Sequence, residues 1–297
     1  MIEHLTGKEL RRILEENGFS FSKSLGQNFL CDERILNKIA DDAQIPSGQT
    51  VLEIGTGAGT LTRILAKRAK RVVTVEIDKR LLSVHEQTLA GFDNITVVPA
   101  DFLALDFPSF FEENLADGFA VCANLPYYIT TPILMRILES GLPFSSVTVL
   151  VQKEVAERMA ARANTPEYGA LTVAVQYYCA AHLCSTVPPS CFYPAPKVAS
   201  RVIRLDRRPH PAVTVRDERL FFSCVRACFA MRRKTLANNL IASFALSRKD
   251  AEEILQACSL APTVRGEALD ARNIARVADE LAIRGIRSPQ IHHKEDF

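Results

Sequence analysis

The segment 51–59 (VLEIGTGAG) constrains the fold of this chain more than any other part of the sequence. An apolar run leads into a turn with glycines at Gly55, Gly57 and Gly59, and helical spacing follows. A glycine-rich turn between a strand and a helix lets the backbone approach a ligand closely. The dinucleotide fingerprint requires Gly or Ala at the sixth position of this turn, where Thr60 stands. The turn therefore disfavours nicotinamide chemistry, and a tight turn between strand and helix without any ligand remains the alternative.

Short β-branched runs alternate with helical stretches over the first half of the chain. Buried strands are predicted at 50–54, 71–77, 94–99, 118–123 and 147–151. Such alternation indicates parallel strands with crossover helices. A helix is favoured at 171–178, although the pattern also fits a strand, and two closing strands are predicted at 182–187 and 198–205. Only helical patterns follow, one opening at Ser247 with a capping-box-like start, so we predict domains at 1–208 and 209–297.

The charge of the chain is distributed unevenly. The net charge is +2, but residues 201–250 contain twelve Lys or Arg residues and four acidic residues, which gives +8 there and −6 elsewhere. This asymmetry suits a polyanion-binding face, although solvated helix faces would also produce it. The eight cysteines lie in apolar runs without a Cys-x-x-Cys pair, which indicates free buried thiols in a reducing cytoplasm. We expect neither an export signal nor a membrane span.

Acidic residues follow the next two predicted strands. Glu76 closes the strand at 71–77, where a carboxylate can accept hydrogen bonds from both ribose hydroxyls. Asp101 follows the strand at 94–99 and is placed to read an adenine amino group beside an aromatic ring. Each acid alone fits a surface position equally well. Three successive strand ends with matching chemistry predict a nucleoside site at the carboxyl edge of the sheet.

The fourth strand ends in the segment 124–128 (NLPYY), which resembles the Asx-Pro-Pro-Tyr signature of methyltransferases that act on nucleobase amino groups, with Leu125 in place of the first proline. The adenine amino group is a poor nucleophile because its lone pair is delocalised into the ring. The Asn124 carbonyl and a main-chain carbonyl can accept its two N–H groups and favour a pyramidal nitrogen aimed at a methyl group. Tyr127 offers a ring face to an extruded base. A strand-ending turn with both tyrosines in the core remains the alternative for this segment alone.

With these segments the chain resembles the family of bacterial small-subunit (16S) ribosomal RNA adenine N6,N6-dimethyltransferases over nearly its whole length. The resemblance rests on the glycine turn, the segment after the fourth strand, and matching stretches at 23–30 (KSLGQNFL), 75–78 (VEID), 101–102 (DF), 151–158 (VQKEVAER), 192–198 (FYPAPKV) and 232–240 (RRKTLANNL). It implies an α/β fold: a Rossmann-like class I S-adenosylmethionine methyltransferase sheet of seven strands, one antiparallel, followed by a small all-helical RNA-binding domain.

The resemblance also implies roles for individual residues. Contact with the cofactor S-adenosylmethionine is implied for Asn28, Leu30, Gly55, Gly57, Glu76, Ile77, Asp101, Phe102 and Asn124. Catalytic roles are implied for Asn124, Leu125, Tyr127 and Phe192, with Tyr127 and Phe192 enclosing the target adenine. The basic residues Arg232, Arg233 and Lys234 are expected to contact RNA phosphates. A basic helix surface that binds no ligand is the alternative. The six histidines, two of them His292 and His293 near the end, have no ligand spacing, so we predict no metal.

The expected reaction is the transfer of methyl groups to N6 of two adjacent adenines near the 3′ end of small-subunit ribosomal RNA, which leaves S-adenosylhomocysteine. The implied partner is the small ribosomal subunit or its precursor, and we expect a cytoplasmic monomer with a role in subunit biogenesis. A dimethyltransferase of the antibiotic-resistance type, acting on large-subunit ribosomal RNA, shares the catalytic motifs, but the segment 232–240 argues for the small subunit. A ribosome-assembly checkpoint with secondary catalysis is the alternative from a different class of function.

Overall fold

The computed structural model describes residues 5–288, which form two compact units. The sheet unit comprises the described residues up to 156 together with 181–207, and the helical unit comprises 157–180 together with those from 208 onward. The predicted division between 208 and 209 is a single cut, whereas the chain passes between the units three times. Aromatic packing explains the difference, because Tyr177 stacks on Phe221 at 5.1 Å and Tyr168 meets Phe229 edge to face at 5.5 Å.

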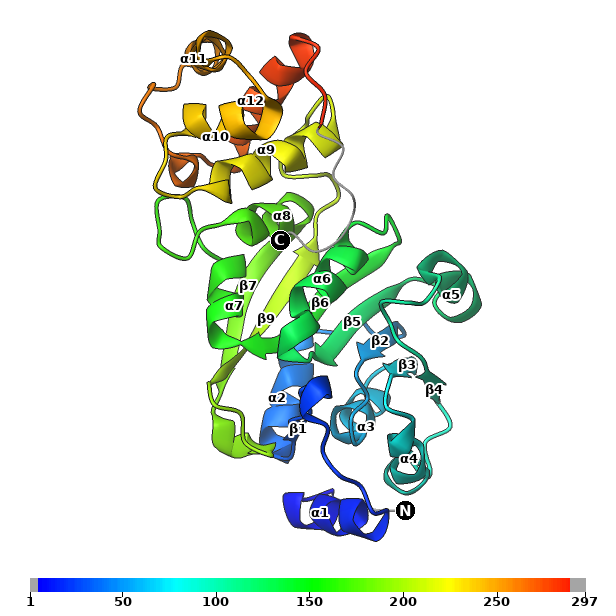
Figure 1. The fold of residues 1–297 in the computed structure, drawn as a ribbon. Helices are drawn as coiled ribbons and strands as arrows, with labels where there is room; N and C mark the ends of the chain where they lie inside the picture. The colour runs from blue at the N-terminus through cyan, green and yellow to red at the C-terminus, as the bar shows by residue number, and fades with distance from the viewer. Residues whose placement is uncertain (1–4, 289–297) are drawn as a thin grey trace. The chain divides into compact units, whose positions relative to one another are not determined.

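Seven strands form the sheet in the order β4-β3-β2-β5-β6-β9-β7 (Figure 1). The strands are β2 (Thr50–Ile54), β3 (Arg71–Glu76), β4 (Ile95–Pro99), β5 (Phe119–Asn124), β6 (Phe144–Gln152), β7 (Cys179–Val187) and β9 (Ser200–Arg207). The pairs β2–β3, β2–β5, β3–β4 and β5–β6 are parallel, and β9 runs antiparallel to β6. The predicted class of fold is confirmed.

The central strands carry apolar side chains on both faces because helices cover them. All five residues of β2 are buried, as are all residues of β3 after Arg71. The helices of the sheet unit are α1 (Gly7–Glu16), α2 (Glu33–Ala43), α3 (Thr60–Ala66), α4 (Leu82–Thr88), α5 (Phe107–Asn114) and α6 (Thr130–Leu138). One hydrophobic cluster joins α2 and α3 to β2, β3, β5, β6 and β9. The loops at the strand ends are thereby fixed to a rigid layer.

A second, two-stranded sheet lies in the same unit. It pairs β1 (Phe29–Leu30) antiparallel to β8 (Phe192–Tyr193), with Leu30 opposite Phe192. The paired residues Leu30 and Phe192 are 162 positions apart in the sequence, and β1 follows directly after the segment 23–28. Both segments belong to the stretches on which the family resemblance rests.

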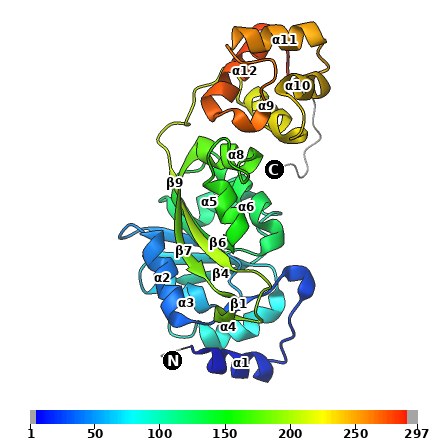
Figure 2. The same cartoon turned by 90° about the vertical axis from the view of Figure 1, so that its left-hand side faces the viewer.

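The helical unit is built from α8 (Ala170–Tyr178), α9 (Glu218–Ala230), α10 (Leu236–Phe244), α11 (Arg248–Ala257) and α12 (Ala271–Ile283), of which the last four gather together in Figure 2; α7 (Lys153–Met159) spans the division. The helix predicted at 171–178 is confirmed. Side chains of Asp217, Thr235, Ser247 and Asp270 each accept the free N–H group of the residue three positions further on in their helices, including the predicted start at Ser247. Within the described residues, no helix has the length and apolar character needed to cross a membrane.

Candidate active site

A pocket lies where β2, β3, β4 and β5 reach their carboxyl ends. The space between its lining side chains amounts to about 830 Å³, a volume that includes solvent at its open side. The structure brings ten of the predicted site residues to its lining: Asn28, Gly55, Gly57, Glu76, Ile77, Asp101, Phe102, Asn124, Leu125 and Tyr127. The loops after four strands and the segment that precedes β1 thus converge on one cavity at the edge of the parallel sheet.

The glycine loop after β2 leaves space that a side chain would fill. Gly55 and Gly57 have φ angles of 81° and 55°, in the left-handed region. A Cβ atom on Gly55 would lie 3.8 Å from the main-chain oxygen of Asn124 and would narrow the pocket there. The Gly57 N–H donates to Oε2 of Glu76 at 2.8 Å, and the Gly57 carbonyl accepts from Nε2 of His85 at 2.8 Å. The loop is therefore held from both sides while its glycines leave the cavity clear.

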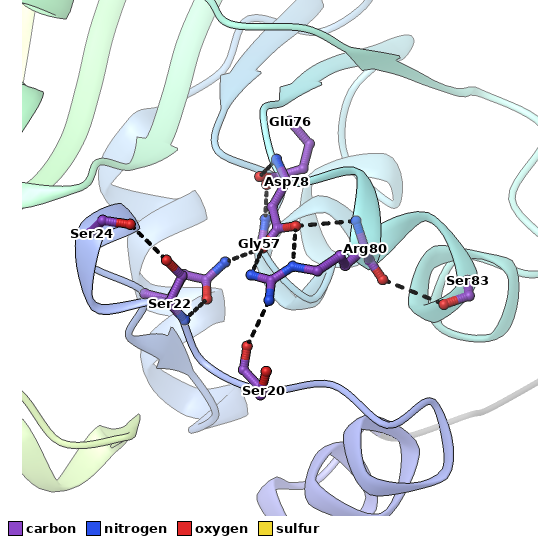
Figure 3. Close-up of polar contacts among 9 residues, drawn as sticks. Ser20, Ser22, Ser24, Gly57, Glu76, Asp78, Arg80 and Ser83 are labelled. Carbon is purple, nitrogen blue, oxygen red and sulfur yellow. Dashed lines mark hydrogen bonds and ion pairs between the residues drawn. The ribbon is translucent and has the colours of Figure 1, made fainter.

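The carboxylate of Glu76 is 5% exposed and is held by two backbone N–H groups. Besides the bond from Gly57, its Oε1 accepts the N–H of Asp78 at 2.8 Å (Figure 3). Burial raises the pKa of Glu76, and these backbone hydrogen bonds act in the opposite direction. Each carboxylate oxygen keeps a second lone pair, so Glu76 can still accept hydrogen bonds from a ligand hydroxyl.

Asn124 ends β5 at the opposite side of the glycine loop. Its Nδ2 donates to the main-chain oxygen of Asn28 at 3.3 Å, and within the described residues its Oδ1 has no hydrogen-bond partner. The amide oxygen is thus available to a ligand at the pocket wall. The hydroxyl of Tyr127 shares a 2.6 Å hydrogen bond with Oγ of Ser200, and burial raises the pKa of Tyr127, so this hydroxyl stays neutral.

Of the residues predicted to contact the cofactor or the target base, two do not line the pocket. Leu30 and Phe192 face each other across β1 and β8, are 2% and 5% exposed, and belong to the hydrophobic cluster around α2. Cofactor contact by Leu30 and base stacking by Phe192 stay predictions.

In the helical unit, Arg232, Arg233 and Lys234 are all exposed between α9 and α10. Arg232 also donates to the carbonyl oxygens of Pro166 and Tyr168. Arg233 and Lys234 therefore remain the cleaner candidates for contact with RNA, a role that stays a prediction for all three. Across residues 5–288 there is no group of three or more His, Cys, Asp or Glu that fits a metal ion, and His292 and His293 lie outside the described residues.

The structure adds three residues to which the sequence analysis gave no role. Gln27 lines the pocket and donates a hydrogen bond to Asp78. His85 forms a hydrogen bond with the carbonyl of Gly57 in the glycine loop, and Ser200 forms one with the hydroxyl of Tyr127. In the segment 23–30 the family resemblance implies roles for Asn28 and Leu30 but none for Gln27. No sequence signal marks His85, because its contact depends on how α4 packs against the loop.

The fold and pocket define a class I methyltransferase dependent on S-adenosylmethionine: a seven-stranded sheet with antiparallel β9, a glycine loop after β2 and a buried acid at the end of β3. The model of the family "Ribosomal RNA adenine dimethylase" matches residues 18–282. The chain belongs to this family, and it is an enzyme that methylates adenine in ribosomal RNA.

Individual relatives agree with this assignment. The chain is 48% identical over 281 residues to a ribosomal RNA small subunit methyltransferase A from Streptococcus pneumoniae (strain CGSP14), covering 93% of this chain and 97% of the relative. A dimethyladenosine transferase from Plasmodium falciparum superposes with a TM-score of 0.72 at 29% identity, over 87% of this chain and 98% of that one. The 23S rRNA methyltransferase ErmE gives a TM-score of 0.65 at 30% identity, over 86% and 99%.

Proposed function

We propose that the chain transfers methyl groups from S-adenosylmethionine to N6 of two adjacent adenines near the 3′ end of small-subunit ribosomal RNA, giving N6,N6-dimethyladenosines. Identity of 48% to a small-subunit methyltransferase, against 30% to a 23S enzyme, supports the small subunit as the target. The substrate would be the small subunit or its precursor, bound by a cytoplasmic monomer through the cations of the helical unit.

The observation that carries this proposal is the amide oxygen of Asn124 at the pocket wall, which has no hydrogen-bond partner among residues 5–288. Nδ2 is engaged by Asn28, so Oδ1 is presented as the acceptor. When it accepts one N6–H of adenine and a main-chain carbonyl of the same turn accepts the other, the nitrogen lone pair is drawn out of conjugation. Bound S-adenosylmethionine would supply the methyl group to this nitrogen and leave as S-adenosylhomocysteine, and the proton of N6 would pass to solvent. An amide cannot serve as a strong base, and none is required.

The residues present fit S-adenosylmethionine, which supplies an electrophilic methyl group on a sulfonium when bound. Glu76 is placed to accept hydrogen bonds from the ribose hydroxyls. Asp101 is exposed and is placed to accept a hydrogen bond from an adenine amino group, and its Oδ1 also accepts the N–H of Leu103 at 2.9 Å. The buried ring of Phe102 forms the apolar wall beside it. The glycine loop leaves room for the amino acid end of the ligand. No metal takes part in this proposal.

The base is expected to lie against Tyr127. The hydrogen bond to Ser200 fixes the position of its hydroxyl, so the ring face is presented in one orientation. A stacked base gains about 1–3 kcal/mol from such a face, which offsets part of the cost of extrusion from the RNA. Because each adenine is methylated twice, the pocket must also accept a nitrogen that already carries one methyl group.

Transfer of tritiated methyl groups tests the proposal. Purified small and large subunits that lack methylated adenines are incubated separately with the chain and labelled S-adenosylmethionine, and the nucleosides are analysed. We expect N6,N6-dimethyladenosine from the small subunit alone. Label in the large subunit alone would favour the antibiotic-resistance type, and binding to immature particles without methyl transfer would favour an assembly checkpoint.

A further inference from the structure

Residues 20–28, here called the strap, form one wall of the pocket without being part of a long helix or a strand. The strap contains one turn of 3-10 helix (Lys23–Leu25) and supplies four lining residues, Leu25, Gly26, Gln27 and Asn28. Few main-chain bonds fix it, among them one from Leu25 N–H to the Ser22 oxygen at 3.3 Å. Its position against the cavity therefore depends strongly on side-chain contacts.

The strap is anchored at Asp78, two residues beyond Glu76. Nε2 of Gln27 donates to Oδ2 of Asp78 at 2.7 Å, while Oε1 of Gln27 accepts the N–H of Ser22 at 2.8 Å. The Asp78 side chain is 4% exposed, and Arg80 binds both its oxygens, through Nη2 at 2.6 Å and Nε at 2.8 Å. This arginine lowers the pKa of Asp78, so the acceptor of the Gln27 bond is charged.

The same arginine joins the strap at a second point. Nη1 of Arg80 donates to the main-chain oxygen of Ser20 at 3.3 Å, and Figure 3 shows its guanidinium lying between Asp78 and Ser20. Hydrogen bonds that involve an ionised partner are about twice as strong as neutral ones. The cluster therefore fixes both ends of the segment 20–27.

The anchor connects the two functional sides of the pocket. On the cofactor side, the N–H of Asp78 donates to Glu76, whose other oxygen holds Gly57. On the substrate side, the residue after Gln27 is Asn28, whose main-chain oxygen accepts Nδ2 of Asn124 at 3.3 Å. Gln27, which donates the hydrogen bond to Asp78, is thus the direct neighbour of Asn28, whose carbonyl orients the Asn124 amide.

We propose that Gln27 is a positioning residue for methyl transfer: it ties the strap to Asp78 and so sets the Asn28 carbonyl that turns the Asn124 amide oxygen toward the target nitrogen. The strap then fixes the position of Asn124 relative to Glu76. The carboxylate that binds the ribose and the amide that binds the base therefore keep a constant separation. This inference rests on the proposed function, because it assigns Asn124 to the target base.

Three full-length variants test the inference. Gln27→Ala removes the bond to Asp78, and Gln27→Glu places a second carboxylate against it. Gln27→Glu combined with Asp78→Asn reverses donor and acceptor and keeps one carboxylate near Arg80. An asparagine remains a good helix-capping residue at position 78, so the reversal preserves the local turn. Ser24→Ala is the control, since Ser24 is exposed on the strap and bonds only Ser22 within the described residues.

Methyl transfer is measured at saturating S-adenosylmethionine and small subunit, and binding of S-adenosylhomocysteine is measured by calorimetry. We expect kcat to fall about tenfold or more in Gln27→Ala and further in Gln27→Glu, the scale of a lost hydrogen bond to a charged group. The double variant should recover much of the loss relative to Gln27→Glu, and Ser24→Ala should match the wild type. A role limited to stability would lower Tm alone.

Unchanged kcat in Gln27→Ala, or a double variant no better than Gln27→Glu, would overturn the inference. Hydrogen exchange gives a reading that needs no RNA: amides at 20–28 should exchange faster in Gln27→Ala than in Ser24→Ala, and equal exchange would also count against it. A wild-type chain that fails to methylate small subunits refutes the proposed function instead, while exchange and calorimetry still report on Gln27.

Discussion

Glu53, the fourth residue of β2, shortly before the glycine loop, should make the stability of the protein fall as pH rises. Its side chain is 1% exposed, and Oε2 accepts the hydroxyl of Thr62 at 2.6 Å. Burial is the main cause that raises its pKa from 4.5 to about 8, and the nearby Glu76 adds to the shift. The folded protein therefore keeps this proton over a range in which the unfolded chain has lost it.

The contribution of this carboxyl is complete below about pH 4.5 and is lost as pH rises through about 8. Each pH unit in that window lowers the free energy of unfolding by about 1.4 kcal/mol, so the loss between about pH 5 and about pH 9 is on the order of 4 kcal/mol. Glu53→Gln removes the titrating proton, keeps the shape and retains an acceptor for Thr62. The variant should therefore lose several kcal/mol less than the wild type over this range.

Urea unfolding of both proteins across the same pH range measures the difference. Glu112→Gln, which alters an exposed carboxyl on α5, is the matched control and should follow the wild type. Parallel curves for the wild type and Glu53→Gln would refute the reasoning, because they would mean that Glu53 ionises alike in the folded and unfolded chain.

Two further predictions concern the helical unit. A Cβ atom on Gly266 would lie 2.0 Å from the main-chain oxygen of Cys228, so Gly266→Ala should lower the free energy of unfolding by about 1–3 kcal/mol. Gly169→Ala is the control and should lower it much less, because a Cβ atom there meets nothing within 4 Å. Equal thermal stability of the two variants would contradict the packing. Replacing Arg233 and Lys234 by alanine should weaken binding to the small subunit and reduce the slope of log affinity against log salt by about 0.7–0.9 for each cation that meets a phosphate. Salt titrations check this, with Arg34→Ala in the sheet unit as control, and an unchanged slope would place the RNA elsewhere.

The strands could be predicted because a sheet that is covered on both faces requires β-branched, apolar runs, which are easily recognised in the sequence. The strand predicted at 71–77 is one residue longer than β3, which ends at Glu76. The difference is Ile77, which is apolar but 48% exposed at the pocket rim. The ambiguous stretch at 171–178 was assigned correctly to a helix. Its membership in the helical unit was not predicted, because the contacts of Tyr168 and Tyr177 with α9 join residues more than 40 positions apart.

The pocket was predictable where function depends on the ends of strands, since topology alone brings Gly55, Glu76, Asp101 and Asn124 to one edge. It was less predictable where side chains act on one another. The contacts of Gln27 with Asp78 and of His85 with Gly57 depend on loop packing that leaves no period in the sequence. For Phe192 the family motif gave a role, while the structure gives the ring a place in the hydrophobic cluster.

The most direct test of the account is the rate of dimethyladenosine formation by Asn124→Ala on unmethylated small subunits, measured beside its affinity for S-adenosylhomocysteine. Loss of the oriented acceptor should reduce turnover by about a hundredfold or more, while the ligand still binds through Glu76 and the glycine loop. Turnover near that of the wild type would contradict the central claim that this amide holds the amino group of the target adenine.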